Sequence, residues 1–377
     1  MMRTSELKPG QRIIVSEFGE DPREAIEKFV HLEENVAAPD PSKLGPQDVI
    51  IAVKSASVGW VDLLMTSGQY QHMPSPPYCP GLEYSGTVAW IGPEVDSTKL
   101  AIGESIFVDG FLAGPRSYGD YQAYGGFATY AVAPVNAIHK LPALLNFDQA
   151  CNLIGNYETA YHCLITRGQL KAGETVLIHG ASGSTGLAAV HIAKIIGATV
   201  IATGRSDDKL KIVKEQGADH VINCKSVDGQ SALRSFKDEV KALTQGKGVD
   251  VVYDGVGGEI SLESLRCVAF GARFLIVGWA STPSVAKGKG QRGAPQANVL
   301  PTNLIMMKGL TVLGSPMAIS TKNDPSIRGP RFEQVMRWVS EGKIKPYVSH
   351  TFPLNSFKEA MIAKWEGKVV GGCVLHP

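Results

Sequence analysis

The sequence predicts an α/β protein of two domains, a β-rich domain followed by a domain with a doubly wound parallel sheet. The chain has 377 residues, of which 44% are hydrophobic and 19% charged, and is therefore long enough to form two ordinary cores. Residues 12–142 alternate short β-type runs with glycine and proline. Beyond them, continuous apolar strands alternate with helices, which is typical of a parallel sheet covered on both faces.

The charge balance argues against nucleic acid as a partner. The 37 basic and 36 acidic residues leave a formal charge of +1, so the chain has no large net field to attract a polyanion. No apolar run approaches the roughly 20 residues of a membrane span, and the first residues lack the apolar core of a secretory signal. The 6 cysteines show no C-x-x-C pair, as expected of reduced thiols. We expect a cytoplasmic protein that acts on a small molecule, without a nucleic-acid or membrane partner.

The elements of the two domains follow from composition and periodicity. In the first domain, strand-like runs occupy residues 47–55, 86–91, 105–109 and 129–133. Near Phe147 the apolar residues change to helical spacing, which predicts a helix between the domains. The second domain should contain strands at 175–179, 199–203, 221–223, 249–253 and 273–277, with helices at 184–196, at 207–216 and up to 243. The chain then continues through a glycine-, lysine- and proline-rich surface loop at 281–297 and a return segment at 331–338 to a final strand at 368–375.

A glycine-rich segment joins the first strand of the second domain to its first helix. Glycines are needed where the backbone turns sharply and where a pyrophosphate approaches the N–H groups of a helix N-terminus. The spacing G-x-x-G-x-x-G alone also fits a structural turn, but the strand before it and the helix after it favour a dinucleotide loop. The predicted cofactor-binding residues of this glycine loop are Gly180, Ala181, Ser182, Gly183, Ser184, Thr185 and Gly186.

The end of the next strand predicts which nicotinamide cofactor binds. A site that prefers NAD has an acidic side chain about 20 residues past the glycine loop, where it binds the ribose 2′-hydroxyl. Here Gly204 leaves room for a 2′-phosphate, and Arg205 or Lys209 can supply its counter-charge. Ser206 is a further candidate cofactor-binding residue. The acidic pair at 207–208 that follows it fits the first turn of a helix, beside its N-cap. The pattern indicates NADPH; the alternative is that both cations are merely solvated.

Taken together, these motifs resemble the medium-chain dehydrogenase/reductase superfamily, in its zinc-independent quinone oxidoreductase and enoyl reductase branch. Besides the glycine loop, the resemblance runs through 58–70 (VGWVDLLMTSGQY), 80–86 (PGLEYSG), 124–132 (YGGFATYAV), 156–161 (NYETAY), 217–223 (GADHVIN), 250–258 (DVVYDGVGG) and 367–370 (GKVV).

The resemblance implies a GroES-like catalytic domain of residues 1–145 and 316–377, and a Rossmann domain of residues 146–315. It also implies a cofactor between the two domains and a homodimer. Further cofactor contacts are implied for Thr159, Gly278 and Lys368. For Thr159 the alternative is that it simply packs in its helix.

The positions that hold catalytic zinc in related alcohol dehydrogenases carry no metal-binding side chain here. The resemblance places Gly59 at the first ligand position and Leu82 at the second, and no cysteine near Asn156 aligns with the third. Neither glycine nor leucine can donate a lone pair to zinc. The four closely spaced cysteines of the structural zinc lobe are also absent from the sequence. We therefore expect no metal.

The missing Lewis acid favours conjugate reduction over alcohol–carbonyl interconversion, which would lack its usual stabilisation of an alkoxide. Hydride added to a quinone or to the β-carbon of an enone places charge on an oxygen that hydrogen-bond donors can hold. The resemblance thus implies an NADPH-dependent enone, enal or quinone reductase. The alternatives are an enoyl-thioester reductase and a non-enzymatic NADPH-binding module.

Two residues of the first domain are candidate catalytic residues through the resemblance. Tyr70, in the G-x-Y element, matches the proposed proton donor of the enoyl reductases, and Asp62 matches a residue near the catalytic cleft. The alternatives are that Tyr70 only lines the substrate site and that Asp62 is a buried structural hydrogen-bonding residue.

The sequence also departs from the family pattern. Gly59 stands where the family often has Asn, and Cys224 stands where it often has Tyr, so one substrate contact and one 2′-phosphate contact are in doubt. The extra length at 110–124 adds Arg116, Tyr118 and Tyr121. This loop either shapes substrate choice or is a surface loop without a role.

Overall fold

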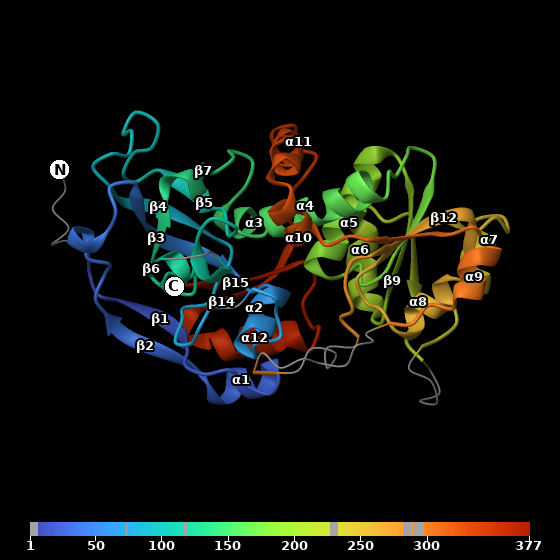
Figure 1. Ribbon diagram of the computed structural model, residues 1–377, viewed down its shortest axis with the longest axis horizontal. Coiled ribbons are helices and arrows are strands. Elements are labelled where there is room, and N and C mark those ends of the chain that lie inside the picture. Colours follow the sequence, from blue (N-terminus) through green and yellow to red (C-terminus); the bar gives the residue numbers. More distant parts are fainter. Residues whose placement is uncertain (1–6, 73, 117–119, 227–232, 282–287, 290–297) are drawn as a thin grey trace. The chain divides into compact units, whose positions relative to one another are not determined.

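The computed structural model describes residues 7–72, 74–116, 120–226, 233–281, 288–289 and 298–377. The chain forms two compact units (Figure 1). The first contains Met1–Gly155, Ala286–Gly293 and Lys345–Pro377, and the second contains Asn156–Val285 and Ala294–Ile344. The predicted α/β class, with one β-rich unit and one parallel-sheet unit, is confirmed.

The first unit is built on a seven-stranded sheet in the order β14-β15-β3-β4-β5-β7, with β6 also paired to β3. Strand β3 is central because it pairs antiparallel with β15, β4 and β6, and eight of its ten residues are buried. A separate antiparallel pair joins β1 to β2. The strands are β1 Gly10–Val15, β2 Val30–Val36, β3 Asp48–Ser57, β4 Tyr84–Ile91, β5 Ser105–Val108, β6 Tyr130–Pro134, β7 Ile138–Lys140, β14 Val348–Pro353 and β15 Gly372–His376.

The helices of the first unit are α1 Pro22–Lys28, α2 Trp60–Thr66, α3 Phe147–Ala150 and α12 Phe357–Trp365. Helix α12 contacts both α1 and α2, and the rings of Trp60 and Trp365 stack with centroids 5.0 Å apart. The last strand begins only at Gly372, whereas the sequence predicted it from 368. Gly367 and Gly371 have φ of 66° and 62°, so the chain turns twice before it can extend.

The second unit contains the predicted parallel sheet, in the strand order β10-β9-β8-β11-β12-β13. Its central strands β8, β9 and β11 are almost entirely buried, which explains why their sequences are continuous apolar runs. The strands are β8 Thr175–Ile178, β9 Thr199–Gly204, β10 His220–Asn223, β11 Val249–Asp254, β12 Val268–Ile276 and β13 Thr311–Gly314.

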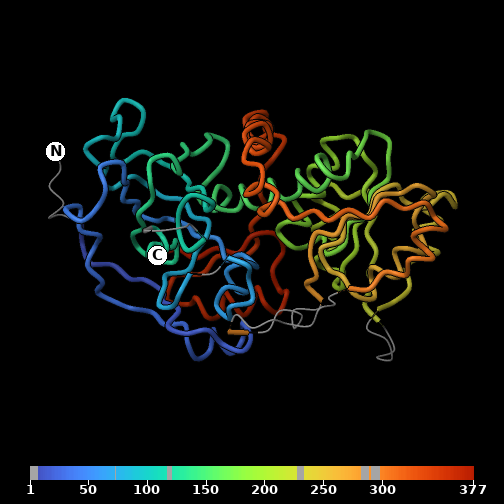
Figure 2. Tube along the Cα trace, in the orientation of Figure 1, coloured from blue at the N-terminus to red at the C-terminus, as the bar shows by residue number. Residues whose placement is uncertain are grey.

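Helices of the second unit connect these strands, as the chain trace shows (Figure 2). Helix α5 ends at Gly197, whose φ of 88° is the left-handed conformation that glycine favours at a helix C-terminus. The helices are α4 Ile154–Tyr161, a π-helical segment His162–Arg167, α5 Ser184–Ile196, α6 Asp207–Glu215, α7 Lys237–Leu243, α8 Glu259–Ser264, α9 Thr302–Met307, α10 Met317–Asn323 and α11 Arg328–Ser340.

Residues 316–344 belong to the second unit, although the resemblance placed them in the first domain. The reason is the packing of α11, because Arg331 forms a buried ion pair with Glu158 of α4. The ring of Trp338 also lies 5.7 Å from that of Tyr161. The chain returns to the first unit only at Lys345.

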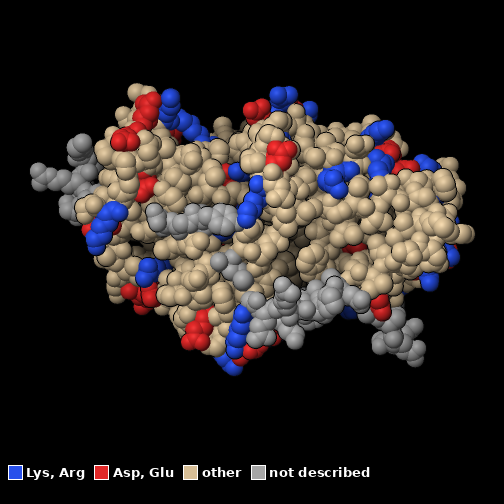
Figure 3. Space-filling model, in the orientation of Figure 1, with Lys and Arg blue, Asp and Glu red and all other residues tan. Residues whose placement is uncertain are grey.

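The surface shows no large field of either charge on the face in Figure 3, where basic and acidic side chains are interspersed. This agrees with the formal charge of +1. Within the ranges that the structure describes, no helix is long and apolar enough to cross a membrane. All six cysteines are free and buried.

Candidate active site

The glycine loop lies between β8 and α5, where close backbone packing requires glycine. A Cβ atom on Gly186 would lie 2.3 Å from the carbonyl oxygen of Gly180, which is closer than any real contact. Gly180 itself has a φ of 64°, in the left-handed region. Gly183 is the N-cap of α5 and provides no side-chain cap to the first amides of this 13-residue helix, a place where proteins bind anions.

The predicted 2′-phosphate residues lie at the adjacent strand end. Gly204 ends β9, which neighbours β8, so the two carboxyl ends meet at the same edge of the sheet. Arg205 is exposed and Lys209 is half-buried. Burial and the nearby positive charge of Arg205 lower the pKa of Lys209, so these two cations lie close enough to repel each other. An anion bound between them would relieve that repulsion.

The acidic pair of α6 lies in the first helical turn, as predicted. Asp207 accepts a hydrogen bond of 2.8 Å from the side-chain amide of Asn223, at the end of β10. Ser206 is the N-cap residue, but its hydroxyl makes no capping hydrogen bond. Cys224 is buried and its Sγ donates to the Gly204 carbonyl oxygen over 3.1 Å.

Two further strand ends complete this edge of the sheet. Asp254, at the end of β11, accepts hydrogen bonds from the backbone amides of Val256 and Gly257, both at 2.9 Å. The amide of Gly278, just past β12, donates to the Asp254 carbonyl oxygen over 3.2 Å. The glycine loop, Gly204 and Gly278 therefore lie at the carboxyl ends of β8, β9 and β12, where a doubly wound sheet binds its ligand.

A buried histidine that the sequence did not single out connects these strand ends. His179 directly precedes the glycine loop and is 1% exposed. Its Nε2 lies 2.6 Å from Oγ of Ser264, whose own hydrogen is donated to the Ile260 carbonyl oxygen, so Nε2 is the donor. Nδ1 then accepts from the hydroxyl of Thr203, 2.8 Å away. His179 is thus a neutral imidazole, and burial lowers its pKa to about 4.

Helix α4 joins the glycine loop to the rest of the second unit. Thr185 donates to Asn156 over 3.1 Å, and the hydroxyl of Tyr157 lies 2.7 Å from Nδ1 of His191 on α5. Thr159 is half-buried on this same helix. The predicted nicotinamide neighbour is therefore on an element that is anchored to the glycine loop.

Within the first unit, Asp62 is 2% exposed on α2 and is engaged by three backbone amides. Its Oδ2 accepts from Gly59 at 2.9 Å, and Oδ1 accepts from Gly81 at 3.2 Å and Leu82 at 3.0 Å. Burial raises the pKa of Asp62 to about 6 against these hydrogen bonds. This geometry supports the structural alternative. It also explains Gly59, because a Cβ there would lie 2.9 Å from Oδ2 of Asp62.

Tyr70 follows the end of α2 and is half-buried. Gly68 turns the chain with a φ of 71°, and the amide of Gln69 donates to the Leu64 carbonyl oxygen over 2.9 Å. The Tyr70 ring stands edge-on to His72, with centroids 6.3 Å apart. Tyr70 is thus presented by a turn that is tied back to α2.

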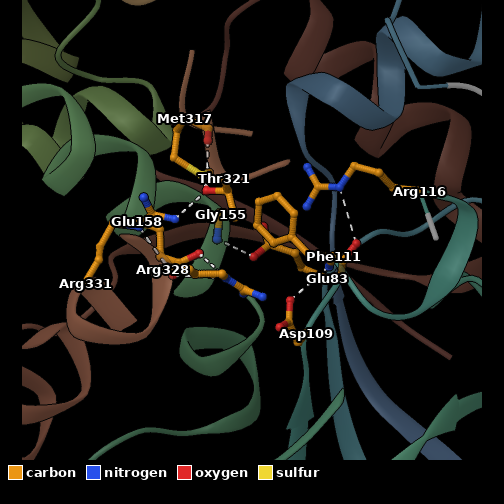
Figure 4. Close-up of polar contacts among 11 residues, drawn as sticks. Glu83, Asp109, Phe111, Arg116, Gly155, Glu158, Met317, Thr321, Arg328 and Arg331 are labelled. Atoms are coloured by element: carbon orange, nitrogen blue, oxygen red, sulfur yellow. Dashed lines mark hydrogen bonds and ion pairs between the residues drawn. The ribbon is translucent and has the colours of Figure 1, made fainter. Parts of the chain in front are cut away.

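Sequence reasoning missed a cluster of carboxyl groups around Glu83 (Figure 4). Its Oε1 accepts from the amide of Gly155 at 2.6 Å. Burial raises the pKa of Glu83 to about 7, and the nearby carboxylates of Asp62 and Asp109 add to the rise. The Gly155 hydrogen bond and the charge of Arg116 act in the opposite direction. The sequence signal that could have found Glu83 was its place directly after Leu82, which stands at a zinc-ligand position of the related alcohol dehydrogenases.

Arg116 is held by its own loop. Its Nε donates to the Gly110 carbonyl oxygen over 3.3 Å, and its guanidinium lies 3.9 Å over the ring of Phe111 (Figure 4). Tyr121 anchors the same segment through a 2.5 Å hydrogen bond to Asp48. Tyr118 of the same loop lies outside the described residues, as do 282–287 and 290–297 of the predicted surface loop.

The remaining predicted positions do not form a metal site. Gly59 has no side chain, and the buried side chain of Leu82 is a hydrocarbon, so neither fits a zinc ion. In the described part of the chain, no three His, Cys, Asp or Glu side chains gather as metal ligands would.

Lys368, a predicted cofactor contact, is exposed in the first unit and pairs with Glu366 at 2.7 Å.

Comparisons with known proteins agree with this arrangement. Residues 45–143 match the family model of the alcohol dehydrogenase GroES-like domain, and residues 184–341 match that of the zinc-binding dehydrogenases. The chain is 33% identical to the quinone oxidoreductase-like protein 2 homolog of Nematostella vectensis over 88% of this chain and 82% of the relative.

Solved structures extend the likeness to the whole fold. A probable oxidoreductase from Mycobacterium abscessus has a TM-score of 0.76 and 28% identity, covering 98% of this chain and 99% of that one. A mycobacterial protein complexed with NADPH has a TM-score of 0.75 and 25% identity, covering 98% of this chain and 100% of that one.

The buried histidine generates a prediction about stability. Because the pKa of His179 falls from 6.5 to about 4 on folding, the unfolded chain binds a proton that the folded chain excludes. Its contribution to stability is complete above pH 6.5 and is lost as the pH falls toward 4, by about 3 kcal/mol at most. Denaturant unfolding at several pH values should show a smaller acid-dependent loss for His179→Gln than for the parent. The exposed His31→Gln control should behave like the parent, and an unchanged pH dependence in His179→Gln would contradict the assignment.

Proposed function

Since the chain belongs to the medium-chain dehydrogenase/reductase superfamily, in its quinone oxidoreductase branch, we propose that it is an NADPH-dependent reductase of quinones and of enones or enals. The observation that carries this proposal is the pair of cations, Arg205 and Lys209, beside the glycine loop, where an NAD enzyme has an acid. The name of the Nematostella relative and the NADPH complex of the mycobacterial protein support it.

The second unit offers the residues that would hold the cofactor. The amides at the start of α5 would bind the pyrophosphate, and Arg205 and Lys209 would bind the 2′-phosphate. Thr159 and Gly278 are proposed to border the nicotinamide end, and Lys368 of the first unit is proposed as a further contact. When bound, NADPH supplies the hydride; the protein positions it and stabilises the charge that the substrate gains.

Reduction without zinc needs hydrogen-bond donors and a proton source from the protein. The hydroxyl of Tyr70 is one candidate, presented by the turn after α2. Glu83 is a second candidate, because its pKa of about 7 leaves it partly protonated at neutral pH. One of its oxygens is fixed by the Gly155 amide, and the residue as a whole is half-buried. Arg116 would then set how readily Glu83 gives up its proton.

The first prediction from this proposal concerns cofactor choice. Calorimetry should show NADPH binding about 30- to 150-fold more tightly than NADH, which corresponds to roughly 2–3 kcal/mol of charge-assisted contacts. Arg205→Ala should remove most of that difference while leaving NADH affinity unchanged. Lys211→Ala, at an exposed position of α6, is the matched control and should keep the preference. Equal affinity of the parent protein for the two cofactors would refute the 2′-phosphate assignment.

The second prediction concerns metal. Because Gly59 and Leu82 offer no donor atoms, purified protein should contain no stoichiometric zinc and should retain its reductase activity in a chelator. Elemental analysis together with activity after dialysis against chelator measures this. About one zinc per chain, lost together with activity, would overturn the zinc-free mechanism.

The third prediction distinguishes the two proton sources. If Tyr70 donates the proton, Tyr70→Phe should lower kcat on an enone by at least about 10²-fold and affect a quinone less, because reduced quinone oxygens take protons from water. If Glu83 donates the proton, the rate of enone reduction by the parent protein should fall as the pH rises above 7. Glu83→Gln should then abolish enone reduction, and with it this falling limb of the pH profile.

Arg116→Met tests whether the pH dependence of the enone rate comes from Glu83. Removing the cation should raise the pKa of Glu83 and move the falling limb of the pH profile to higher pH. Arg116→Lys, which keeps the charge, should leave the limb near its original place. A limb that does not move in Arg116→Met excludes Glu83, and a Tyr70→Phe variant with the parent enone rate excludes Tyr70.

A further inference from the structure

A short segment of the chain packs in the first unit although its flanks belong to the second. Residues Ala286–Gly293 are part of the first unit, whereas Asn156–Val285 and Ala294–Ile344 form the second. Within this segment the structure describes Gly288 and Lys289. Contacts of these two residues with the first unit therefore show how the segment is held there.

Gly288 lies so close to the backbone of the first unit that a side chain does not fit. It is buried, and a Cβ atom on it would lie 2.3 Å from the carbonyl oxygen of Glu20, which precedes α1. Lys289 has a φ of 57°, a left-handed conformation that a lysine keeps only where its surroundings hold it. Its Nζ lies 2.8 Å from Oε1 of Glu20, but both side chains are more than half exposed, so this ion pair adds little. The docking depends mainly on the backbone.

The backbone amide of Lys289 caps the end of α2. It donates to the carbonyl oxygen of Ser67 over 2.8 Å, and the amide of Gly19 donates to that of Thr66 over 3.3 Å. The last carbonyl groups of a helix have no partner within the helix, and Thr66 and Ser67 are both 0% exposed, so water does not satisfy these oxygens. Residues that are distant in the sequence therefore complete the C-terminus of α2.

Ser67 in turn holds the turn that presents Tyr70. The hydroxyl of Ser67 donates to Oε1 of Gln69 over 2.9 Å, and the amide of Gln69 donates to the Leu64 carbonyl oxygen over 2.9 Å. Tyr70 follows Gln69 directly. The residue that Lys289 caps is thus also the residue from which this turn is held, so a displacement of Ser67 would be passed on to Tyr70.

The flanks of the segment are held at the sheet edge proposed to bind the cofactor. The hydroxyl of Ser281 donates to the Val256 carbonyl oxygen over 2.8 Å. The side-chain amide of Asn298 donates to Oγ of Ser261 over 2.7 Å, and Ser261 donates to Asp254 at the end of β11. These contacts lie within the second unit and do not involve Lys289, so loss of the Lys289 cap should leave the cofactor residues in place.

We propose that Gly288 and Lys289 form a strap that caps α2 and thereby positions Tyr70. Both are positioning residues, because they act on the reaction only through Ser67 and the turn that follows it. The proposal rests on the proposed reductase function for its catalytic consequence, since Tyr70 is a candidate proton donor there. The capping itself is measured without turnover.

Hydrogen exchange of the full chain tests whether the strap holds the turn. Lys289→Pro removes the donating amide and cannot adopt a φ of 57°, so the amides of Gly68–Tyr70 should exchange about tenfold faster than in the parent. Gly288→Ala should act in the same direction, through the contact of its Cβ with Glu20. Lys289→Gly is the matched control: it keeps the amide and favours this φ, and should exchange like the parent.

Enone reduction tests whether the strap positions Tyr70. Lys289→Pro should lower kcat on an enone by about tenfold or more, because a small displacement of a catalytic group is costly, and should leave the affinity for NADPH unchanged. In the Tyr70→Phe background the same change should cause no further loss, since the displaced hydroxyl is already absent. A purely structural role of the strap would lower the rate of both backgrounds alike.

Unchanged exchange at Gly68–Tyr70 in both Lys289→Pro and Gly288→Ala overturns the proposal, whatever reaction the protein catalyses. Faster exchange with the parent enone rate overturns the positioning role, and so does an additive loss in the double variant. A parent protein that reduces no enone, or a Tyr70→Phe variant with the parent rate, counts against the proposed function instead. The exchange pattern then still decides whether the strap holds the turn.

Discussion

The close approach of Gly186 to Gly180 is the contact on which the candidate cofactor site depends. Because a Cβ at 186 would lie 2.3 Å from the Gly180 carbonyl oxygen, only glycine lets α5 begin directly against the end of β8. That approach exposes the first amides of α5 at the sheet edge where β9 and β12 also end. His179, the residue directly before the glycine loop, stabilises this arrangement through hydrogen bonds to Thr203 and Ser264. The predicted binding residues are thus positioned by backbone packing and one neutral imidazole.

Each of the two units contains a group of buried ionisable side chains. In the first unit, burial raises the pKa of Glu83 to about 7, and the nearby carboxylates of Asp62 and Asp109 add to the rise against the charge of Arg116. In the second unit, Arg328 and Arg331 both pair with the buried carboxylate of Glu158. The same physical rule, that buried charge must be compensated, accounts for both.

The sequence predicted the features that depend on local pattern. Apolar runs predicted the parallel sheet, and glycine spacing between a strand and a helix predicted the loop. The acidic pair at 207–208 lies in the first turn of α6 as expected. The sequence could not predict contacts between distant residues, such as Glu83 with Gly155, His179 with Ser264, or Glu158 with Arg331. The last of these also explains why residues 316–344 pack in the second unit, because the partner of Arg331 on α4 is far away in the sequence.

The central claim is that this chain reduces conjugated carbonyl compounds with NADPH and without a metal. Steady-state oxidation of NADPH by the purified protein, measured in chelator with quinones, enones, enals and enoyl thioesters in turn, tests it most directly. The account predicts turnover with at least one quinone, enone or enal and a higher kcat/KM for NADPH than for NADH. Activity confined to enoyl thioesters would identify a different substrate class, and tight NADPH binding with no turnover on any compound would contradict the account.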